Sequence, residues 1–595
     1  MDMLLNYLTQ VAYLCFYLLG TAFRLVFQPR PADHVRHLAD HPSNDRPSRT
    51  TLHSEGSIGS RADSALQRLQ EGLKAYRLTA SIEAPQKFIP RSHLQRLVRE
   101  HVQEILREQS IVDDKRVPLF GQLISEEATQ LFATLVDVKK EHHIIDFLEE
   151  GIRDKNLPFV RTRKLRRLGS GLLTRQNKPI QTINDWDWQS IEALENKQYR
   201  VLSPVFQRGA HYELDNLHIL PFIEQETEVE DVPMEAGGYG EVSRECIHPD
   251  HHEFQTSPAR DGLVVAVKRV FRKAHFELER KVYLDLGPIR HPHLIELLFT
   301  FRKKDKCHLV FPWADGNLKD YWGRSPIPEL TRDLLLWSLE QMAGIASGLA
   351  CFHEFTNPAH GHTRFGRHGD IKAQNILWFH AENVLKIADL GVANVRGRDS
   401  RSNIPRSTVA DSPTYSPPDI QRQQHISRRW DIWSLGCLYL EYITYLVLGY
   451  PAILAFSTLR REPSSQYPEL FTDEFYATDY KSVKPSVNDW VAQLQQNSRC
   501  ASVLHDILDL IMTEMIVIDP NARSPSLKIY KKINAMLRHA KENEEYALKP
   551  KLKAQNLPNS AIRLRLVHFD SMQAWRPLVP QSIPLGPQKR STWHP

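Results

Sequence analysis

The stretch from His368 to Asn375, followed by Asp389-Leu390-Gly391, constrains this chain more than any other part of it. Within it, carboxylates, a lysine and an asparagine recur at short spacing: Asp370, Lys372, Asn375 and Asp389. Phosphoryl transfer from ATP needs such a set, because one carboxylate takes the proton of the attacking hydroxyl while a lysine offsets charge on the moving group. An asparagine and a second aspartate supply the oxygen ligands that magnesium prefers. The stretch therefore indicates ATP-dependent phosphoryl transfer.

These residues resemble the catalytic loop H-R-D-x-K-x-x-N and the D-F-G motif of eukaryotic protein kinases. Gly369 replaces the arginine of that pattern, and Leu390 replaces the phenylalanine. The lysine two residues after the aspartate is typical of serine/threonine kinases, so the resemblance implies protein serine and threonine hydroxyls as acceptors. The implied roles are catalytic for Asp370 and Lys372, and Mg²⁺ binding for Asn375 and Asp389.

A glycine-containing stretch, 235–242, resembles the kinase loop G-x-G-x-x-G-x-V. Glycines suit such a loop because side chains would keep the backbone amides away from the phosphates of ATP. The expected nucleotide contacts here are Gly237, Gly238, Gly240 and Val242. Glu235 takes the place of the first glycine, and its negative charge would weaken ATP binding.

The strand Val265-Ala266-Val267-Lys268 resembles the kinase motif V-A-I-K, in which an apolar strand carries one lysine to the phosphates. Ala266 and Lys268 are then expected at the nucleotide. A helix over about 273–286 follows, and Glu279 is the expected partner of Lys268. Glu277 is the alternative, because the glycine and proline after residue 286 leave the helical register open.

The apolar run 309–314 breaks at Pro312 and is expected to enter the hinge between two lobes. Adenine would pair with backbone groups at 312–314, which makes Trp313 and Ala314 expected contacts. Phe311 would lie at the back of the nucleotide pocket.

Residues 412–419 resemble the segment T-x-x-Y-x-A-P-E that closes the kinase activation loop. Asp419 stands in the position of its acid, and Arg523 is the expected buried partner. Ser412 replaces the threonine that braces the catalytic residues in serine/threonine kinases. Asp431 begins a match to D-x-W-S-x-G and is expected to hold the backbone of the catalytic loop.

The order of short strands from about 217 and long helices after about 330 predicts an α+β fold with the two lobes of a protein kinase. Residues 217–540 would form this domain, and 541–595 a basic tail that contains prolines. A helical and irregular region, 63–215, would precede it. Within that region we expect a helix opened by a Ser92–Gln95 capping box, another from about Ser125, and an irregular stretch over 161–215.

Residues 3–27 are mostly apolar, with polar side chains at steps of three or four along one face. The segment 1–28 therefore predicts a membrane anchor, either spanning or lying in the interface, or a helix docked on the rest of the protein. Residues 29–62 are expected to be a flexible linker. If the helix spans, the arginines after it place the kinase region in the cytosol.

Composition narrows the partners and the compartment. Lys and Arg exceed Asp and Glu by only 76 − 71 = 5, so no nucleic-acid partner is expected. The 6 cysteines form no C-x-x-C pair, which favours a reducing, cytoplasmic environment over a disulfide framework.

Finer features, among them Ser203-Pro204-Val205-Phe206 and Phe365-Gly366-Arg367, resemble a group of fungal serine/threonine kinases with a helical N-terminal region. Two functions remain open. An active kinase is favoured because a scaffold has no chemical need of the retained lysines, aspartates and asparagine. A pseudokinase that binds nucleotide as a scaffold is favoured by Glu235 and Gly369.

Overall fold

The computed structural model describes most of the chain between residues 64 and 551. The described residues are 64–81, 86–161, 171–224, 235–237, 240–254, 262–287, 289–356, 361–391, 393–397, 413–419, 421, 427–463, 469 and 471–551. The predicted apolar helix 1–28, the linker 29–62 and most of the tail 541–595 lie outside them.

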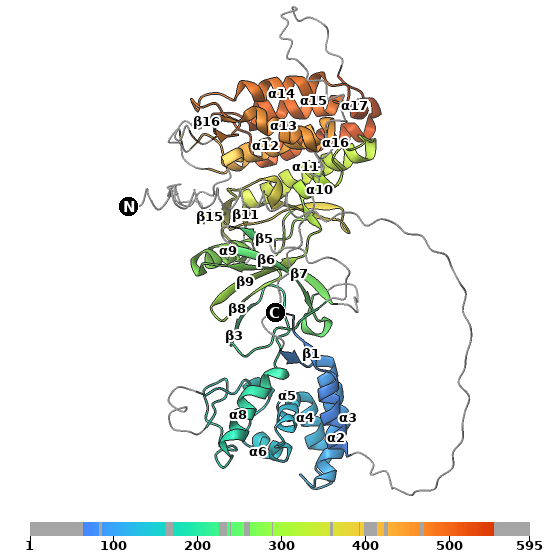
Figure 1. Cartoon of the computed structure of the whole chain (residues 1–595), viewed down its shortest axis with the longest axis vertical. Helices are drawn as coiled ribbons and strands as arrows, with labels where there is room; N and C mark the ends of the chain where they lie inside the picture. The colour runs from blue at the N-terminus through green and yellow to red at the C-terminus, as the bar shows by residue number, and fades with distance from the viewer. Residues whose placement is uncertain are drawn as a thin grey trace, which may run out of the picture. The chain divides into compact units, whose positions relative to one another are not determined.

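The first described part is a helical region with an apolar core of its own, as the sequence predicts. Its elements are α2 (Ala65–Ala75), β1 (Leu78–Thr79), β2 (Lys87–Phe88), α3 (Arg91–Glu108), α4 (Val117–Glu127), α5 (Thr129–Asp137), η1 (Glu141–His143), α6 (Ile144–Glu149), η2 (Asp154–Asn156), α8 (Trp188–Lys197) and η3 (Gln198–Arg200) (Figure 1). In α3, apolar residues recur every three or four positions, so one face is buried: Leu94, Leu97, Val98, Val102, Ile105 and Leu106.

Two sequence expectations for this region are wrong. The helix expected from about Ser125 is two helices, because α4 begins at Val117 and ends before Ala128, after which α5 starts. The stretch expected to be irregular contains α8, which begins where the Asp187 side chain accepts a hydrogen bond from the N–H of Ser190.

The predicted Ser92–Gln95 capping box is also wrong. Helix α3 begins at Arg91 after Pro90, and no side chain of its own first turn caps it. The backbone N–H of Ser92 instead donates to Asp250 Oδ2 at 3.0 Å, and the Ser92 hydroxyl donates to the same oxygen. A carboxylate at this end suits the positive pole of the helix dipole. A residue distant in sequence thus supplies the cap.

The small lobe is a 7-stranded sheet in the order β3-β8-β9-β7-β6-β4, with β5 pairing β6. Its strands are β3 (His211–Leu214), β4 (Phe222–Ile223), β5 (Glu235–Gly237), β6 (Gly240–Ile247), β7 (Leu263–Val270), β8 (Phe299–Lys303) and β9 (Lys306–Pro312), with η4 (Pro249–His251) after β6. The pairing of β3 with β8 is parallel, whereas the other pairings are antiparallel. Strand β3 lies in the stretch expected to be irregular.

Helix α9 (Lys273–Leu286) has the bounds that the sequence predicts, and it ends at Gly287 with φ +60°. It buries Phe276, Glu279, Val282, Tyr283 and Leu286. Four of these are apolar, so the one buried acid of the helix stands out as the residue that needs a partner.

The large lobe is mainly helical and has the largest apolar core described here. Its helices are α10 (Leu318–Arg324), α11 (Arg332–His353), η5 (Ala373–Asn375), η7 (Pro413–Tyr415), α12 (Arg429–Leu448), α13 (Tyr450–Arg460), α14 (Pro485–Gln496), α15 (Ser502–Leu510), η8 (Ile511–Met515), α16 (Ser526–Glu542) and α17 (Glu544–Leu548). Short strands lie among them: β10 (Gly316–Asn317), β11 (Phe355–Thr356), β12 (Thr363–Arg367), β13 (Ile376–Phe379), β14 (Val384–Ile387), β15 (Asn394–Gly397), β16 (Glu462–Pro463) and β17 (Phe471–Thr472).

Two long helices form the centre of this lobe. In α12, every residue from Trp430 to Val447 is buried, so the helix is enclosed on all sides. Among the described helices, α11 is long and apolar enough to span a membrane. However, 61% of its most apolar 18-residue stretch is buried inside the protein. That burial is expected for the core helix of a globular lobe.

Candidate active site

Strands β6, β7 and β9 bring the expected nucleotide-binding residues together. Val242 pairs with Lys268 across β6 and β7, and Ala266 pairs with Phe311 across β7 and β9. Gly237 pairs with Gly240 at the turn between β5 and β6. Gly238 lies outside the described residues.

Gly240 meets a steric requirement. A Cβ at this position would lie 2.4 Å from the backbone oxygen of Arg269 on the neighbouring strand. A Cβ atom essentially never lies that close to a backbone oxygen, so any larger residue would push β6 away from β7. Glycine therefore keeps this turn close to the strand that carries Lys268.

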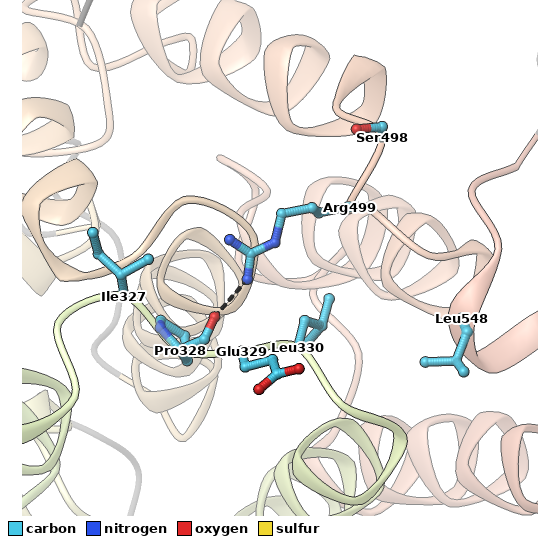
Figure 2. A pocket seen from close by; sticks show the side chains of 7 residues that line it. All are labelled: Ile327, Pro328, Glu329, Leu330, Ser498, Arg499 and Leu548. Atoms are coloured by element: carbon cyan, nitrogen blue, oxygen red, sulfur yellow. Dashed lines mark hydrogen bonds between the residues drawn. The ribbon is translucent and has the colours of Figure 1, made fainter. Parts of the chain in front are cut away.

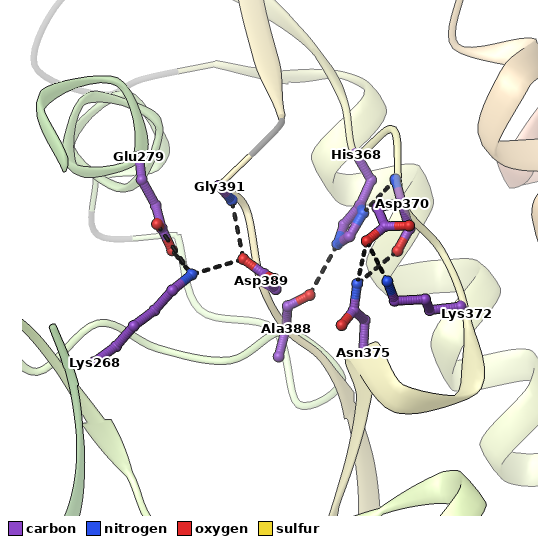
Figure 3. Close-up of polar contacts among 9 residues, drawn as sticks. All are labelled: Lys268, Glu279, His368, Asp370, Lys372, Asn375, Ala388, Asp389 and Gly391. Atoms are coloured by element: carbon purple, nitrogen blue, oxygen red, sulfur yellow. Dashed lines mark hydrogen bonds and ion pairs between the residues drawn. The ribbon is translucent and has the colours of Figure 1, made fainter. Parts of the chain in front are cut away.

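Lys268 lies between two carboxylates (Figure 3). Its Nζ is 2.9 Å from Glu279 Oε1 and 2.7 Å from Asp389 Oδ1. The structure thus pairs Lys268 with Glu279, and the alternative Glu277 pairs with Arg280 on the same helix. Asp389 also accepts the N–H of Gly391 at 3.2 Å. A strand, a helix and a loop therefore meet at one ammonium group.

Charge balance at this point favours the ionised forms of Lys268 and Asp389. Burial disfavours a charged lysine, but Asp389 and Glu279 outweigh it and raise the pKa of Lys268 above its ordinary value. Burial likewise opposes ionisation of Asp389, yet Lys268 lowers its pKa to about 2. Burial raises the pKa of Glu279, against the opposing effect of Lys268. Asp389 is the open member, with 46% of its side chain exposed.

The second cluster surrounds Asp370 (Figure 3). Lys372 Nζ lies 2.8 Å from Asp370 Oδ2, and Asn375 Nδ2 donates to the same oxygen at 3.0 Å and to the Asp370 carbonyl at 2.8 Å. The side chain of Asn375 is buried, whereas Asp370 and Lys372 are half-buried. The buried Asn375 thus holds the carboxylate of Asp370 in place, and the ammonium of Lys372 lies beside that carboxylate.

The predicted scaffold role of Asp431 is confirmed. Its Oδ2 accepts the N–H of His368 and its Oδ1 accepts the N–H of Gly369, each at 2.8 Å. Gly369 has φ +87°, a left-handed conformation that disfavours other residues. Helix α12 therefore fixes the backbone immediately before Asp370.

The sequence did not assign a role to two histidines of this framework. The ring of His368 links the N–H of Asp370, at 3.2 Å, to the carbonyl of Ala388, at 3.0 Å, and so connects both catalytic clusters. His353 Nε2 lies 2.8 Å from Asp431 Oδ2. His353 ends an apolar helix and belongs to no motif. Only its burial beside an acid indicates that it is part of this framework.

The expected pair of Asp419 and Arg523 is confirmed. Arg523 donates to both oxygens of Asp419, at 2.6 and 3.0 Å, and both side chains are fully buried. The pair joins the end of the segment 412–419 to the loop before α16. Ser412 itself lies outside the described residues, as do the activation-segment positions Ser400, Ser402, Ser407 and Thr408.

Asn375 and Asp389 each have an oxygen atom that suits a hard cation. Asn375 points its nitrogen at Asp370, which leaves the amide oxygen on the other side of the group, and Asp389 is the partly exposed carboxylate. No group of three or more histidine, cysteine or acidic side chains in the described part of the chain has the arrangement of a metal site. Magnesium held here would thus use Asn375, Asp389 and phosphate oxygens, which is how magnesium usually binds with nucleotides.

The hinge positions follow β9, which ends at Pro312. Trp313 and Ala314 are half-buried, and the Arg244 guanidinium lies 5.8 Å from the centre of the Trp313 ring. Phe311 is 7% exposed, and its ring lies 5.4 Å from that of Tyr283 on α9. Phe311 is therefore buried against the helix that carries Glu279.

A cavity of about 530 Å³ lies elsewhere in the large lobe (Figure 2). Its lining residues are Ile327, Pro328, Glu329, Leu330, Ser498, Arg499 and Leu548. Arg499 Nη2 donates to the carbonyl of Pro328 at 2.6 Å, so its charge is used to join two loops. No residue of the two catalytic clusters lines this cavity.

Comparison with known proteins shows which family the residues around the site resemble. Residues 253–523 match the protein kinase domain. Cyclin-dependent kinase-like 4 of Homo sapiens is 27% identical over 198 residues, which are 32% of this chain and 47% of that protein. Serine/threonine-protein kinase ATG1c of Arabidopsis thaliana is 32% identical over 196 residues, 31% of this chain and 24% of the relative.

A receptor kinase is also similar to this chain over part of its length. The putative L-type lectin-domain containing receptor kinase II.2 of Arabidopsis thaliana is 28% identical over 214 residues, 35% of this chain and 27% of that protein. The chain thus spans about half or less of the length of these relatives. Together with the two-lobed fold and the paired clusters at Lys268 and Asp370, the match places residues 253–523 in the eukaryotic-type protein kinase superfamily.

Proposed function

We propose that residues 217–540 act as a serine/threonine protein kinase that transfers the γ-phosphoryl group of ATP to protein hydroxyls. The observation that carries the proposal is the bonding of one ammonium group, Lys268 Nζ, to both Glu279 and Asp389. Such an arrangement directs a positive charge and a carboxylate to the same place, which phosphoryl transfer requires.

In this proposal Asp370 orients the acceptor hydroxyl and takes its proton. Lys372, 2.8 Å from Asp370, stabilises negative charge on the transferring group. Lys268 contacts the nucleotide phosphates, and Glu279 holds it in place. Asn375 and Asp389 would hold a magnesium ion, which would supply charge neutralisation for the phosphates.

The alternative is a pseudokinase scaffold, which Glu235 and Gly369 favour. Transfer of radiolabelled phosphate from ATP to a generic protein substrate separates the two functions. Asp370→Asn should reduce transfer on the order of 10² to 10⁴-fold, because the proton acceptor is lost. The exposed Asp489→Asn on α14 is the matched control and should transfer at the normal rate. Equal incorporation by the wild type and Asp370→Asn would favour the scaffold.

Acceptor specificity has its own test, because its support is the lysine pattern around Lys372 and the similarity to a protein named as a serine/threonine kinase. Acid hydrolysis of the labelled product should release phosphoserine and phosphothreonine. Phosphotyrosine as the main product would contradict the proposed specificity.

Regulation is proposed to be independent of a phosphate–arginine latch. A glycine at 369 has no side chain to meet a phosphate on the activation segment, and its φ of +87° disfavours replacement by arginine. Combined alanine substitution of Ser400, Ser402, Ser407 and Thr408 should leave activity in place. Loss of activity in that variant would contradict this part of the proposal.

We also propose that residues 3–27 attach the protein to a membrane with the kinase domain in the cytosol. The support is the length and apolar character of the segment. Deletion of residues 1–28 should move the protein from the membrane fraction to the soluble fraction. Unchanged fractionation would contradict the anchor.

A further inference from the structure

The large lobe contains a buried charged cluster that the catalytic roles above do not use. At its centre the guanidinium of Arg460, at the end of α13, is fully buried between the rings of Phe456 and Phe475, 4.0 Å from each ring centre. A buried arginine is costly unless its donors are satisfied. Its carboxylate partners therefore identify what the cluster connects.

One partner belongs to the central helix. Arg460 Nη2 donates to Glu441 Oε1 on α12 at 3.2 Å. Glu441 also accepts the hydroxyl of Tyr415 at 2.6 Å. Burial raises the pKa of Glu441, and Arg460 opposes that rise. The cluster thus reaches the end of the activation segment, residues 413–419, through Tyr415.

The other partner is Asp473, in the loop after β17. Arg460 Nε donates to its backbone oxygen at 3.0 Å. Its carboxylate oxygen Oδ2 lies 3.6 Å from Arg460 Nη2. The carboxylate also accepts from two hydroxyls: Oδ1 from Thr414 at 2.5 Å and Oδ2 from Ser457 at 2.7 Å. Asp473 is therefore the junction between α13 and the end of the activation segment.

Helix α12 relates this junction to the catalytic loop. Asp431, Ser434 and Glu441 are spaced three and seven residues apart, which places them along one face of the helix. Asp431 holds the backbone before Asp370, and Ser434 donates to the carbonyl of Tyr415 at 2.8 Å. The same helix face thus positions the catalytic loop and the segment 413–419.

We propose that Asp473 is a positioning residue for the polypeptide substrate, acting through Thr414 on the end of the activation segment. This inference rests on the proposed kinase function. A polypeptide that presents a hydroxyl to Asp370 must lie beside a surface fixed relative to the catalytic loop, and 413–419 is held on the helix that holds that loop. Asp473 adds a further attachment of this segment, through the hydroxyl of Thr414.

The matched variants are Thr414→Val and Ser457→Ala. Each removes one hydroxyl from Asp473, but only the first releases the activation segment. With the best peptide from a serine/threonine positional library, Thr414→Val should raise the peptide KM about tenfold, the usual effect of losing a hydrogen bond to a charged group. Its KM for ATP should stay within about twofold, since Thr414 does not reach the Lys268 cluster. Ser457→Ala should leave both KM values unchanged.

Thr414→Ser keeps the hydroxyl and should restore the wild-type peptide KM. If Thr414→Val and Ser457→Ala change the peptide KM equally, Asp473 only stabilises the lobe and the inference is overturned. Direct binding of the fluorescently labelled peptide distinguishes this failure from failure of the proposed function. If the wild type transfers no phosphate but Thr414→Val still weakens peptide binding, the proposed kinase function is wrong and the positioning role stands. If Thr414→Val leaves peptide binding unchanged, the positioning role is overturned.

Discussion

The ion pair of Asp419 and Arg523 and the ion pair of Asp389 and Lys268 use the same chemistry in opposite environments. Both side chains of the first pair are 0% exposed, whereas Asp389 is 46% and Lys268 15% exposed. Burial makes a pair rigid and dependent on its partner. Partial exposure lets a charged group accept a ligand. The first pair therefore holds the fold, and the second leaves a carboxylate open to a ligand.

The largest stability effect is expected at the buried pair. Arg523→Met removes the guanidinium that balances the charge of Asp419 in the interior, which should lower the free energy of unfolding by about 3–5 kcal/mol. Denaturant unfolding of the large lobe, followed by tryptophan fluorescence, measures the change. The double variant Asp419→Asn with Arg523→Met is the control. It should recover the part of the loss that comes from the uncompensated charge, but not the part from the three backbone carbonyls to which Arg523 donates. A double variant no better than Arg523→Met would show that the two residues act separately.

The largest effect on activity is expected at the exposed pair. Under the proposed function, Asp389→Asn removes the open carboxylate and the charge stabilisation that a magnesium ion held there would supply, worth several kcal/mol, so phosphate transfer should fall about a hundredfold or more. Lys268 keeps Glu279, so the melting temperature should change little. Thermal stabilisation by Mg-ATP should shrink in this variant. A large drop in melting temperature without nucleotide would place Asp389 with the structural pairs.

A third environment is a buried group that stays neutral. His251 in η4 is 3% exposed, and burial lowers its pKa to about 4 from an ordinary value of 6.5. The unfolded chain then binds more protons between pH 4 and 6.5, so stability should rise with pH across this window and fall on acidification. The full shift corresponds to about 3 kcal/mol. Unfolding measured at pH 4.5 and 7 checks the effect.

His251→Asn is the control for this pH dependence. Its side-chain amide replaces the ring nitrogen Nδ1, which donates to the Pro204 carbonyl at 3.0 Å. His293 has a pKa lowered to about 4 by burial as well, so the wild type and the variant share that part of the slope. Only the difference between them belongs to His251. Identical slopes would contradict the assignment.

The kinase lobes were predictable because their chemistry needs fixed spacings in the sequence. Lys268, Asp370, Asn375 and Asp389 each stand within a short motif, and α9 follows the apolar period of its own residues. Asp431 and the pair of Asp419 and Arg523 were predictable for the same reason. In each case a short motif carries the signal, and the pairing of Asp419 with Arg523 follows from the resemblance of their motifs to those of kinases.

The sequence could not reveal contacts between distant segments where no motif links them. Ser92 has the local signature of a capping box, yet Asp250 takes its hydrogen bonds. Strand β3 shows no strong apolar alternation, and pairing with β8 is what makes it a strand. Asp473 belongs to no motif, and its link to Thr414 follows only from the fold. A single sequence shows the residues in such pairs but not which ones meet.

The smallest effect is expected where both partners face water. Arg68 on α2 and Glu104 on α3 form an ion pair at 2.6 Å with side chains 39% and 48% exposed. Water and salt screen such a pair, so Glu104→Gln should lower the free energy of unfolding by less than about 1 kcal/mol. The difference should shrink further in 0.5 M salt, whereas the loss in Arg523→Met should persist because salt does not reach a fully buried pair. A salt-independent loss above 1 kcal/mol in Glu104→Gln would mean that geometry, and not exposure, decides what an ion pair contributes in this protein.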